Sequence, residues 1–265
     1  MKLLVIGNSH AGMLRHAAED VGTQSPGLVF MAREGTGPLS LRPRGSVLAA
    51  SHKELREALT RLDMPHSVDL REVDAAVLVG MSASVFQLGA MLSLHDVWGW
   101  SEADEGRPLL SEPALLAGLR ALIEDSLAYR LAIRVRRGRR DLPVLIVPQP
   151  YPSEAILGSE GRFGGIRRLK YRWTGARAAE ALDAAHAGVF GQMRDVHLVP
   201  RPPEAVVHGC FTHLDFMRDA GRLSLAGRQP DADILHANRR YGAEVLATVA
   251  AMLGARLPEL PATSS

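Results

Sequence analysis

The feature that most constrains the fold is a series of short apolar runs, most of which end at a glycine or a proline. The clearest run, Ala75–Val79, is apolar at every position and stops at Gly80. A strand that is apolar on both faces belongs in a sheet covered on both sides, as parallel sheets are. Four further runs are predicted to be strands, namely Lys2–Ile6, Gly27–Met31, Pro143–Val147 and Val196–Val199.

Helical segments separate these runs along the chain. The segments that we predict to be helices include Ala11–Asp20, Glu112–Arg136, Ala176–Arg194 and Arg239–Leu253. Strands that alternate with helices form a parallel, doubly wound sheet, so the sequence predicts an α/β fold. Two long segments, 89–112 and 151–174, interrupt the alternation and are predicted to be loops.

Length and composition allow one large globular domain, or at most two small ones. A chain of 265 residues can bury a full core, and we expect a single domain over residues 1–257 followed by a disordered tail over 258–265. The single cysteine, Cys210, excludes an internal disulfide and a metal site built from several cysteines. The formal net charge of +2 is too small to hold a polyanion along its length, so nucleic acid is not an expected partner.

The N-terminal apolar run ends at Gly7, which is short for the apolar region of a secretory signal. No apolar stretch approaches the roughly 20 residues that cross a bilayer. We therefore expect a cytoplasmic protein with no transmembrane segment.

Two short motifs near opposite ends of the chain carry the chemistry. Ser9 follows the first predicted strand, and Asp233-Ile234-Leu235-His236 precedes the last predicted helix. A serine hydroxyl attacks a carbonyl only when a base removes its proton and a third group orients that base. We predict that Ser9 is the nucleophile, that His236 is the base and that Asp233 orients it. Asp231 competes with Asp233 for the orienting role.

Several of these residues are expected at one edge of the sheet. Ligands bind parallel sheets beyond the carboxyl ends of the strands, and Ser9, Gly35, Gly80 and Gln149 all follow predicted strands. Gln149 is a predicted substrate contact. The Ser9 backbone N–H, at the start of a helix, is the expected donor to a developing oxyanion. His10 is interpreted as a cap of that helix.

The two end motifs resemble those of the SGNH (GDSL-type) hydrolase superfamily. Gly7-Asn8-Ser9-His10 is similar to the Gly-Asp-Ser block with Asn in the Asp position, and residues 233–238 are similar to the C-terminal Asp-x-x-His-x-Asn block. The order of blocks and strands extends the resemblance over essentially the whole chain. It implies a flavodoxin-like, three-layer α/β/α sandwich with a central, mostly parallel five-stranded sheet. It also implies a triad of Ser9, Asp233 and His236, with no metal or organic cofactor.

The chain departs from the family in its third block, Gly-x-Asn-Asp, whose Asn donates to the oxyanion. Gly80-Met81-Ser82 follows the matching strand here. Ser82 is able to donate through its hydroxyl, although a hydroxyl rotates more freely than an amide held by packing. Loss of one such donor costs about 10²–10³ in rate, so a slower enzyme or another donor is implied. The glycine of the second block corresponds to Gly35 or Gly37, and we favour Gly35.

We expect a serine esterase that hydrolyses an O-acyl ester of a carbohydrate or another small alcohol through an acyl-enzyme at Ser9. An O-acyltransferase using the same triad stays open, because the sequence does not define the acceptor. A non-catalytic descendant that binds a glycan or a protein partner is a second alternative.

A dinucleotide-binding domain is a third alternative. Gly7-x-Ser9-x-x-Gly12 follows a strand, and Glu34 lies near the end of the next one, where a ribose-binding acid belongs. However, the Cβ of Ser9 stands where the pyrophosphate must approach the backbone. This alternative also leaves the Asp-x-x-His motif unexplained.

Overall fold

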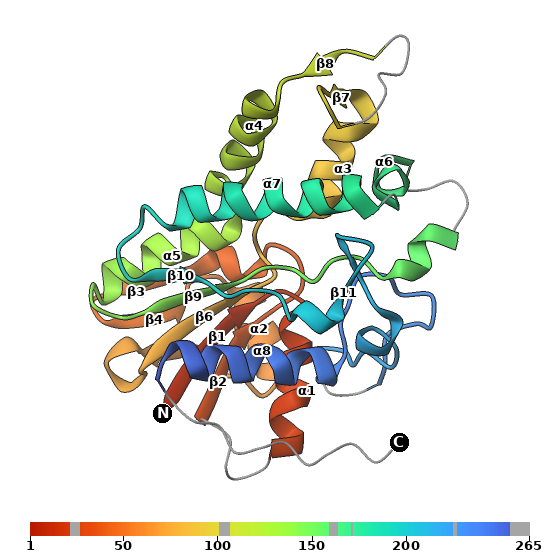
Figure 1. Cartoon of the computed structure of the whole chain (residues 1–265). Helices are drawn as coiled ribbons and strands as arrows, with labels where there is room; N and C mark the ends of the chain where they lie inside the picture. Colours follow the sequence, from red (N-terminus) through yellow and green to blue (C-terminus); the bar gives the residue numbers. More distant parts are fainter. Residues whose placement is uncertain (22–26, 101–106, 159–163, 171, 225–226, 255–265) are drawn as a thin grey trace.

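The computed structural model describes residues 1–21, 27–100, 107–158, 164–170, 172–224 and 227–254, so the predicted tail lies outside the described residues. Its centre is a sheet of five parallel strands (Figure 1). In spatial order these are β2 (Gly27–Ala32), β1 (Lys2–Gly7), β6 (Ala75–Val79), β9 (Val144–Val147) and β10 (Val196–Leu198). Numbered along the chain, this is the 2-1-3-4-5 order of flavodoxin-like folds. The predicted fold class is confirmed.

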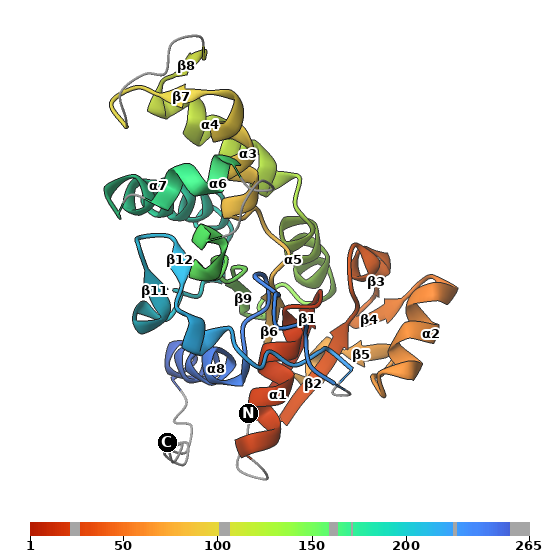
Figure 2. The same ribbon diagram turned by 90° about the vertical axis from the view of Figure 1, so that its right-hand side faces the viewer.

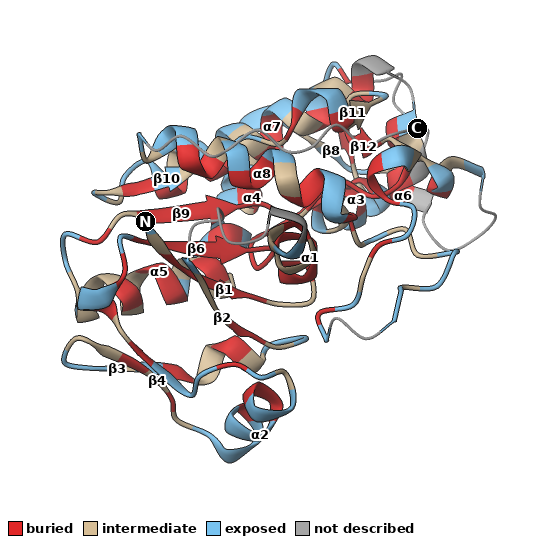
Figure 3. Cartoon of the chain, turned by 90° about the horizontal axis from the view of Figure 1, so that it is seen from below, coloured by how far each residue is buried: buried red, intermediate tan, exposed pale blue. Residues whose placement is uncertain are grey.

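Helices cover both faces of the sheet. The four that frame it are α1 (Ala11–Val21), α5 (Leu127–Gly138), α7 (Arg172–Phe190) and α8 (Arg239–Met252). α1 and α8 pack against each other on one face, and α5 packs on the opposite face (Figure 3). α7 packs beside the edge strand β10. These three layers form the predicted sandwich.

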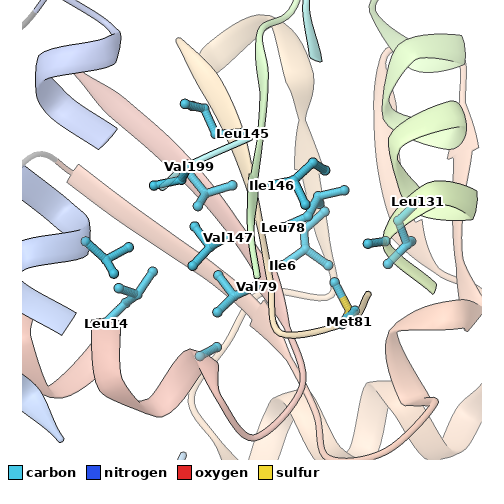
Figure 4. Close-up of a cluster of buried hydrophobic side chains, with 14 of the residues drawn as sticks. Ile6, Leu14, Leu78, Val79, Met81, Leu131, Leu145, Ile146, Val147 and Val199 are labelled. Atoms are coloured by element: carbon cyan, nitrogen blue, oxygen red, sulfur yellow. The ribbon is translucent and has the colours of Figure 1, made fainter. Parts of the chain in front are cut away.

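Aliphatic side chains fill the space between the layers (Figure 4). Leu78 and Ile146 extend from the central strands toward Leu131 on α5, while Val79 lies on the side of Leu14 on α1. All five side chains are buried. Every residue of β6 is buried, as its unbroken apolar sequence predicts for a central strand.

The contact between α1 and α8 requires a glycine. A Cβ added to Gly242 would lie 2.1 Å from the carbonyl oxygen of Met13, a distance that no real side chain tolerates. The absence of a side chain at Gly242 therefore lets α8 lie against the backbone of α1. This close approach brings the segment that precedes α8 to the carboxyl end of β1.

The segment predicted as one helix, Glu112–Arg136, is two helices. α4 (Glu112–Glu124) ends before Ser126, and α5 begins after it. The Ser126 hydroxyl accepts the Tyr129 N–H and so caps a new helix. The two helices also contact different partners, since α4 packs on α7 and α5 packs on the sheet.

The segments 89–112 and 151–174 contain more regular structure than predicted. α3 (Val85–Leu94) extends into the first segment, and β7 (Asp96–Val97) pairs with β8 (Leu109–Leu110). With α4 they form an arm that projects from the sheet at the top of Figure 1. The second segment holds η4 (Glu154–Gly158), α6 (Gly164–Arg167), η5 (Arg168–Lys170) and the start of α7. The prediction of two plain loops is therefore wrong.

A second, antiparallel sheet lies beside α5 (Figure 2). It comprises β3 (Leu41–Arg44), β4 (Val47–Ala50) and β5 (Ser67–Asp69), and α2 (Lys53–Arg61) connects β4 to β5. The remaining short elements are η2 (Gly37–Ser40), η3 (Leu70–Glu72), η6 (Pro203–Ala205), β11 (Val206–Val207), β12 (Phe211–Thr212) and η7 (Leu214–Phe216). Within the described ranges, no helix combines the length and apolar character needed to span a membrane.

Candidate active site

The turn between β1 and α1 holds Ser9 at the carboxyl edge of the sheet. The Asn8 side chain fixes this turn, because its amide donates to the carbonyl of Gly80 (2.7 Å) and its oxygen accepts the His10 N–H (3.1 Å). Asn8 therefore joins the turn that holds Ser9 to the end of the neighbouring strand β6. Ser9 itself is half-buried.

The loop before α8 is fixed by backbone hydrogen bonds. The Ser153 N–H donates to the Ile234 carbonyl (2.9 Å), and the Asn238 N–H donates to the Phe216 carbonyl (2.8 Å). One oxygen of Asp233 accepts the backbone N–H groups of Leu235 (2.7 Å) and His236 (3.4 Å). These bonds turn the chain so that the Asp233 carboxylate faces the imidazole of the same loop.

The two ends of the chain meet in one line of hydrogen bonds. The Ser9 hydroxyl lies 2.9 Å from His236 Nε2, and His236 Nδ1 lies 2.6 Å from the second oxygen of Asp233. A carboxylate only accepts, so Nδ1 carries the proton and Nε2 is left to accept from Ser9. The structure thus brings together the three residues predicted as a triad, which are up to 227 positions apart. Asp233 occupies the orienting place, and Asp231 is exposed.

The environment keeps Asp233 charged. Burial would raise the pKa of its carboxyl, but hydrogen bonds from the His236 ring and the Leu235 N–H outweigh this effect and hold the pKa below its usual value. The carboxylate is therefore ionised at neutral pH and is suited to stabilising a positive charge on His236.

His10 is a site residue that the sequence did not reveal. Its ring stacks on that of His236, with centroids 5.0 Å apart and planes inclined by 29°. Burial, and secondarily the charge of His236, lower the pKa of His10 to about 3, so its ring is neutral at physiological pH. Gly80 makes room for it, because an added Cβ there would lie 2.7 Å from the Cβ of His10. A histidine beside a serine gives no signal of such a stack.

Ser82 makes a hydrogen bond that draws its proton away from Ser9. Its hydroxyl lies 2.9 Å from Nε2 of His186, whose Nδ1 lies 3.0 Å from the Leu182 carbonyl. A carbonyl only accepts, so Nδ1 carries the ring proton and Ser82 donates to Nε2. Burial, followed by the charge of Arg201, lowers the pKa of His186 to about 4 and keeps this ring neutral. In this arrangement the Ser82 proton is not directed to an oxyanion.

The other predicted ligand contacts lie at the expected edge of the sheet. Gly35 is exposed in the turn after β2 and has a left-handed φ of +64°. Gly80 follows β6, but its N–H donates to the Val147 carbonyl and its own carbonyl accepts from Asn8. Gln149 follows β9, and its carbonyl accepts from Arg201. Ligand contact at Gly35, Gly80 and Gln149 stays a prediction.

The described part of the chain contains no group of three or more His, Cys, Asp or Glu side chains arranged to hold a metal ion. Cys210 is buried, and burial raises the pKa of its thiol.

Neither a protein-family model nor a curated protein matches this sequence. Among solved structures, the chain is similar to a Bacteroides ovatus protein described as a GDSL-like lipase (12% identity, TM-score 0.38, 97% of this chain and 55% of that one). It is also similar to the periplasmic domain of a lipopolysaccharide acetyltransferase from Salmonella ser. Paratyphi A (11% identity, TM-score 0.43, 95% of this chain and 83% of that one). A third similar structure is that of a DUF4886 family protein from Bacteroides uniformis (11% identity, TM-score 0.43, 100% of this chain and 88% of that one).

This chain thus spans about half the length of the first of these proteins. At such identities the similarity concerns the fold alone, and it assigns no activity to this chain.

Replacing Ser82 tests its bond to His186. Ser82→Ala leaves the fully buried Nε2 of His186 without a donor, so we expect the free energy of unfolding to fall by about 1–3 kcal/mol. Because the Ser82 proton points to His186, we expect kcat to fall by much less than the 10²–10³ that loss of an oxyanion donor causes. Urea denaturation and ester kinetics measure the two quantities. A full loss of kcat at unchanged stability would instead assign the hydroxyl to the oxyanion.

The two buried histidines predict how stability depends on pH. Each has a pKa below its unfolded value of 6.5, near 3 for His10 and near 4 for His186, so the unfolded chain binds more protons between these limits. The contribution of the two neutral rings to the free energy of unfolding is therefore fully present above pH 6.5, and it declines as the pH falls. Urea denaturation at pH 7.5 and pH 5 should reveal a loss of about 2 kcal/mol for each ring. The double variant Ser82→Ala/His186→Leu should lose about half of this dependence, and an unchanged slope would contradict the assignment.

Proposed function

We propose that this protein is a serine hydrolase of SGNH type that cleaves an O-acyl ester through an acyl-enzyme at Ser9. The observation that carries the proposal is the hydrogen-bonded line from the Ser9 hydroxyl through His236 to Asp233, with distances of 2.9 Å and 2.6 Å. The motif resemblance at both ends of the chain supports the same assignment.

The first half of the reaction follows from this geometry. His236 Nε2 takes the proton of the Ser9 hydroxyl as its oxygen bonds to the ester carbonyl carbon. The imidazolium that forms is stabilised by the charged Asp233. When the tetrahedral intermediate collapses, the bond to the alcohol oxygen breaks and His236 gives that oxygen the proton. The acyl group then remains on Ser9.

The second half repeats these steps with an acceptor in place of the serine hydroxyl. His236 takes a proton from water, the water oxygen attacks the acyl carbon, and Ser9 leaves with the proton from the imidazolium. An alcohol acceptor in the same place would make the protein an O-acyltransferase. Both reactions use the same three side chains, so only the acceptor distinguishes them.

Oxyanion stabilisation has to come mainly from backbone groups in this proposal. Ser82 donates to His186, and the Gly80 N–H is bonded to Val147. We assign the donor role to the Ser9 N–H, which lies just before α1, where the helix dipole favours negative charge. Gly35, in the exposed turn after β2, is the second donor that we propose.

For the substrate we propose an acyl ester of a carbohydrate or another small alcohol. Ser9 and the predicted contact residue Gln149 both follow strands that end at the same edge of the sheet. The reaction as written needs no metal or organic cofactor, since His236 supplies both proton transfers.

Replacing the nucleophile is the most direct test. Ser9→Ala should lower ester hydrolysis by about 10³-fold or more, because among the described residues no other hydroxyl is hydrogen-bonded to His236, while the melting temperature changes little. A fluorophosphonate probe should label the wild-type protein at Ser9 and fail to label Ser9→Ala and His236→Ala. The control Ser93→Ala, an exposed serine on α3, should be labelled like the wild type.

Two results would contradict the proposal. Hydrolysis that survives Ser9→Ala places the nucleophile elsewhere, and an inert Ser9 in the intact protein favours a non-catalytic binding module. Turnover of an acetyl ester with and without an added carbohydrate acceptor then separates the hydrolase, which needs water alone, from the acyltransferase.

The stack of His10 on His236 predicts a positioning role. His10→Ala removes the ring that supports the imidazole of the base, so kcat should fall roughly ten- to a hundredfold while KM stays close to that of the wild type. His10→Phe keeps a planar ring and should recover most of the loss. If both variants retain the wild-type kcat, with their folding checked by thermal melting, the stack has no part in catalysis.

A further inference from the structure

A basic cavity lies where the described residues 218–221 and 227–228 meet α1 and the start of α8. Its volume is about 540 Å³, which falls in the usual range of about 300–1,000 Å³ for small-molecule sites. Four arginines line it, and His16 contributes from α1. The arginines are Arg218, Arg228, Arg239 and Arg240.

The charges around this cavity are unbalanced. Among the described residues that line it, the acidic side chain is Asp219, which forms an ion pair with Arg228 at 2.6 Å. Both partners of this pair are well exposed, so solvent weakens their attraction. His16 Nε2 is already bonded to the Arg222 carbonyl (2.9 Å). With Arg239 left out of the count, three guanidinium groups against one carboxylate leave a formal excess of two positive charges.

The start of α8 adds to this positive potential. The first turn of this 14-residue helix carries Arg239 and Arg240 and no acidic residue, although cations are unfavourable at a helix N-terminus. Asn238 caps the helix by accepting the N–H groups of Arg240 and Tyr241, which satisfies hydrogen bonding but supplies no negative charge. An anion in the cavity would supply it.

One of the guanidinium groups is already supported in place. Arg240 lies over the ring of Phe216, 4.4 Å from its centroid. A guanidinium held against an aromatic face loses less freedom when it binds a ligand. Arg240 is exposed, and its contact with the Phe216 ring restricts its guanidinium beside the cavity.

We propose that this cavity binds a phosphoryl group. A tetrahedral dianion offers acceptor oxygens to several guanidinium groups at once, whereas one arginine satisfies a carboxylate. The site adjoins the loop that carries the base, since Asn238 lines it and Arg218 and Asp219 also line a second cavity of about 300 Å³ that reaches Asp233. Binding here does not require that Ser9 be catalytic.

Titration calorimetry with inorganic phosphate and with pyrophosphate, at constant ionic strength, tests the proposal. We expect saturable binding at one site, and a melting temperature raised by roughly 3–5 °C when the ligand is at ten times its Kd. Acetate at the same ionic strength should have no such effect. Ser9→Ala should bind phosphate like the wild type, which separates this test from the esterase proposal.

Substitutions of the arginines test whether phosphate binds in this cavity. Arg228→Gln and the double variant Arg228→Gln/Arg240→Gln should weaken phosphate binding at least about tenfold, since each guanidinium supplies a charge-assisted hydrogen bond. The exposed side chain of Arg228 makes its single variant safe for folding. The control Arg44→Gln removes an exposed arginine of β3 and should bind like the wild type. Absence of saturable binding, equal binding of acetate, or unchanged affinity in both cavity variants would overturn the proposal.

The phosphoryl group has two possible sources, which the ester assay distinguishes. If it belongs to the substrate or acyl donor, free phosphate should compete and raise the KM of a phosphorylated ester without changing its kcat. If the ligand is a free phosphate, KM for such an ester should not rise with phosphate concentration. Both outcomes presuppose the binding measured by calorimetry and so support the site.

Discussion

The close contact between α1 and α8 is the constraint on which the rest of the site depends. Ser9 is fixed by the sheet, because it follows β1 directly. His236 belongs to a loop outside the central sheet, so its position depends on where α8 lies and on the backbone hydrogen bonds that fix the loop. Gly242 lets α8 approach the backbone of α1, and this contact brings an imidazole near one end of the chain within 2.9 Å of a hydroxyl near the other.

Two ionisable groups near Ser9, Asp233 and His10, differ in charge although both are shielded from solvent. Asp233 and His10 both lose solvent, yet only Asp233 receives hydrogen bonds that favour its charged form. The carboxylate therefore stays ionised, whereas the His10 ring stays neutral. A charged His10 stacked on His236 would oppose protonation of the base during the reaction. The neutral ring provides contact without this electrostatic cost, which is why its burial is compatible with the proposed chemistry.

The sequence predicted those features that depend on local pattern. The run Ala75–Val79 predicts a buried strand independently of its surroundings. Asp233 and His236 are close enough in sequence to meet within one loop. The features that it missed depend on contacts between distant segments. Ser82 and His186 are 104 positions apart, and neither has a neighbour that indicates the bond. The break at Ser126 arises because α4 and α5 pack on different partners, although their sequences continue one helical pattern.

Ser9 and His236 are held by different kinds of structure. Ser9 follows a central strand that pairs on both sides, whereas the described residues 213–224 and 227–238 form a mostly irregular segment. A few bonds fix this segment, among them those from Ser153 to Ile234 and from Asn238 to Phe216. The basic cavity is built from this segment, from His16 on α1 and from the start of α8, so the proposed phosphoryl site and His236 depend on the same part of the chain.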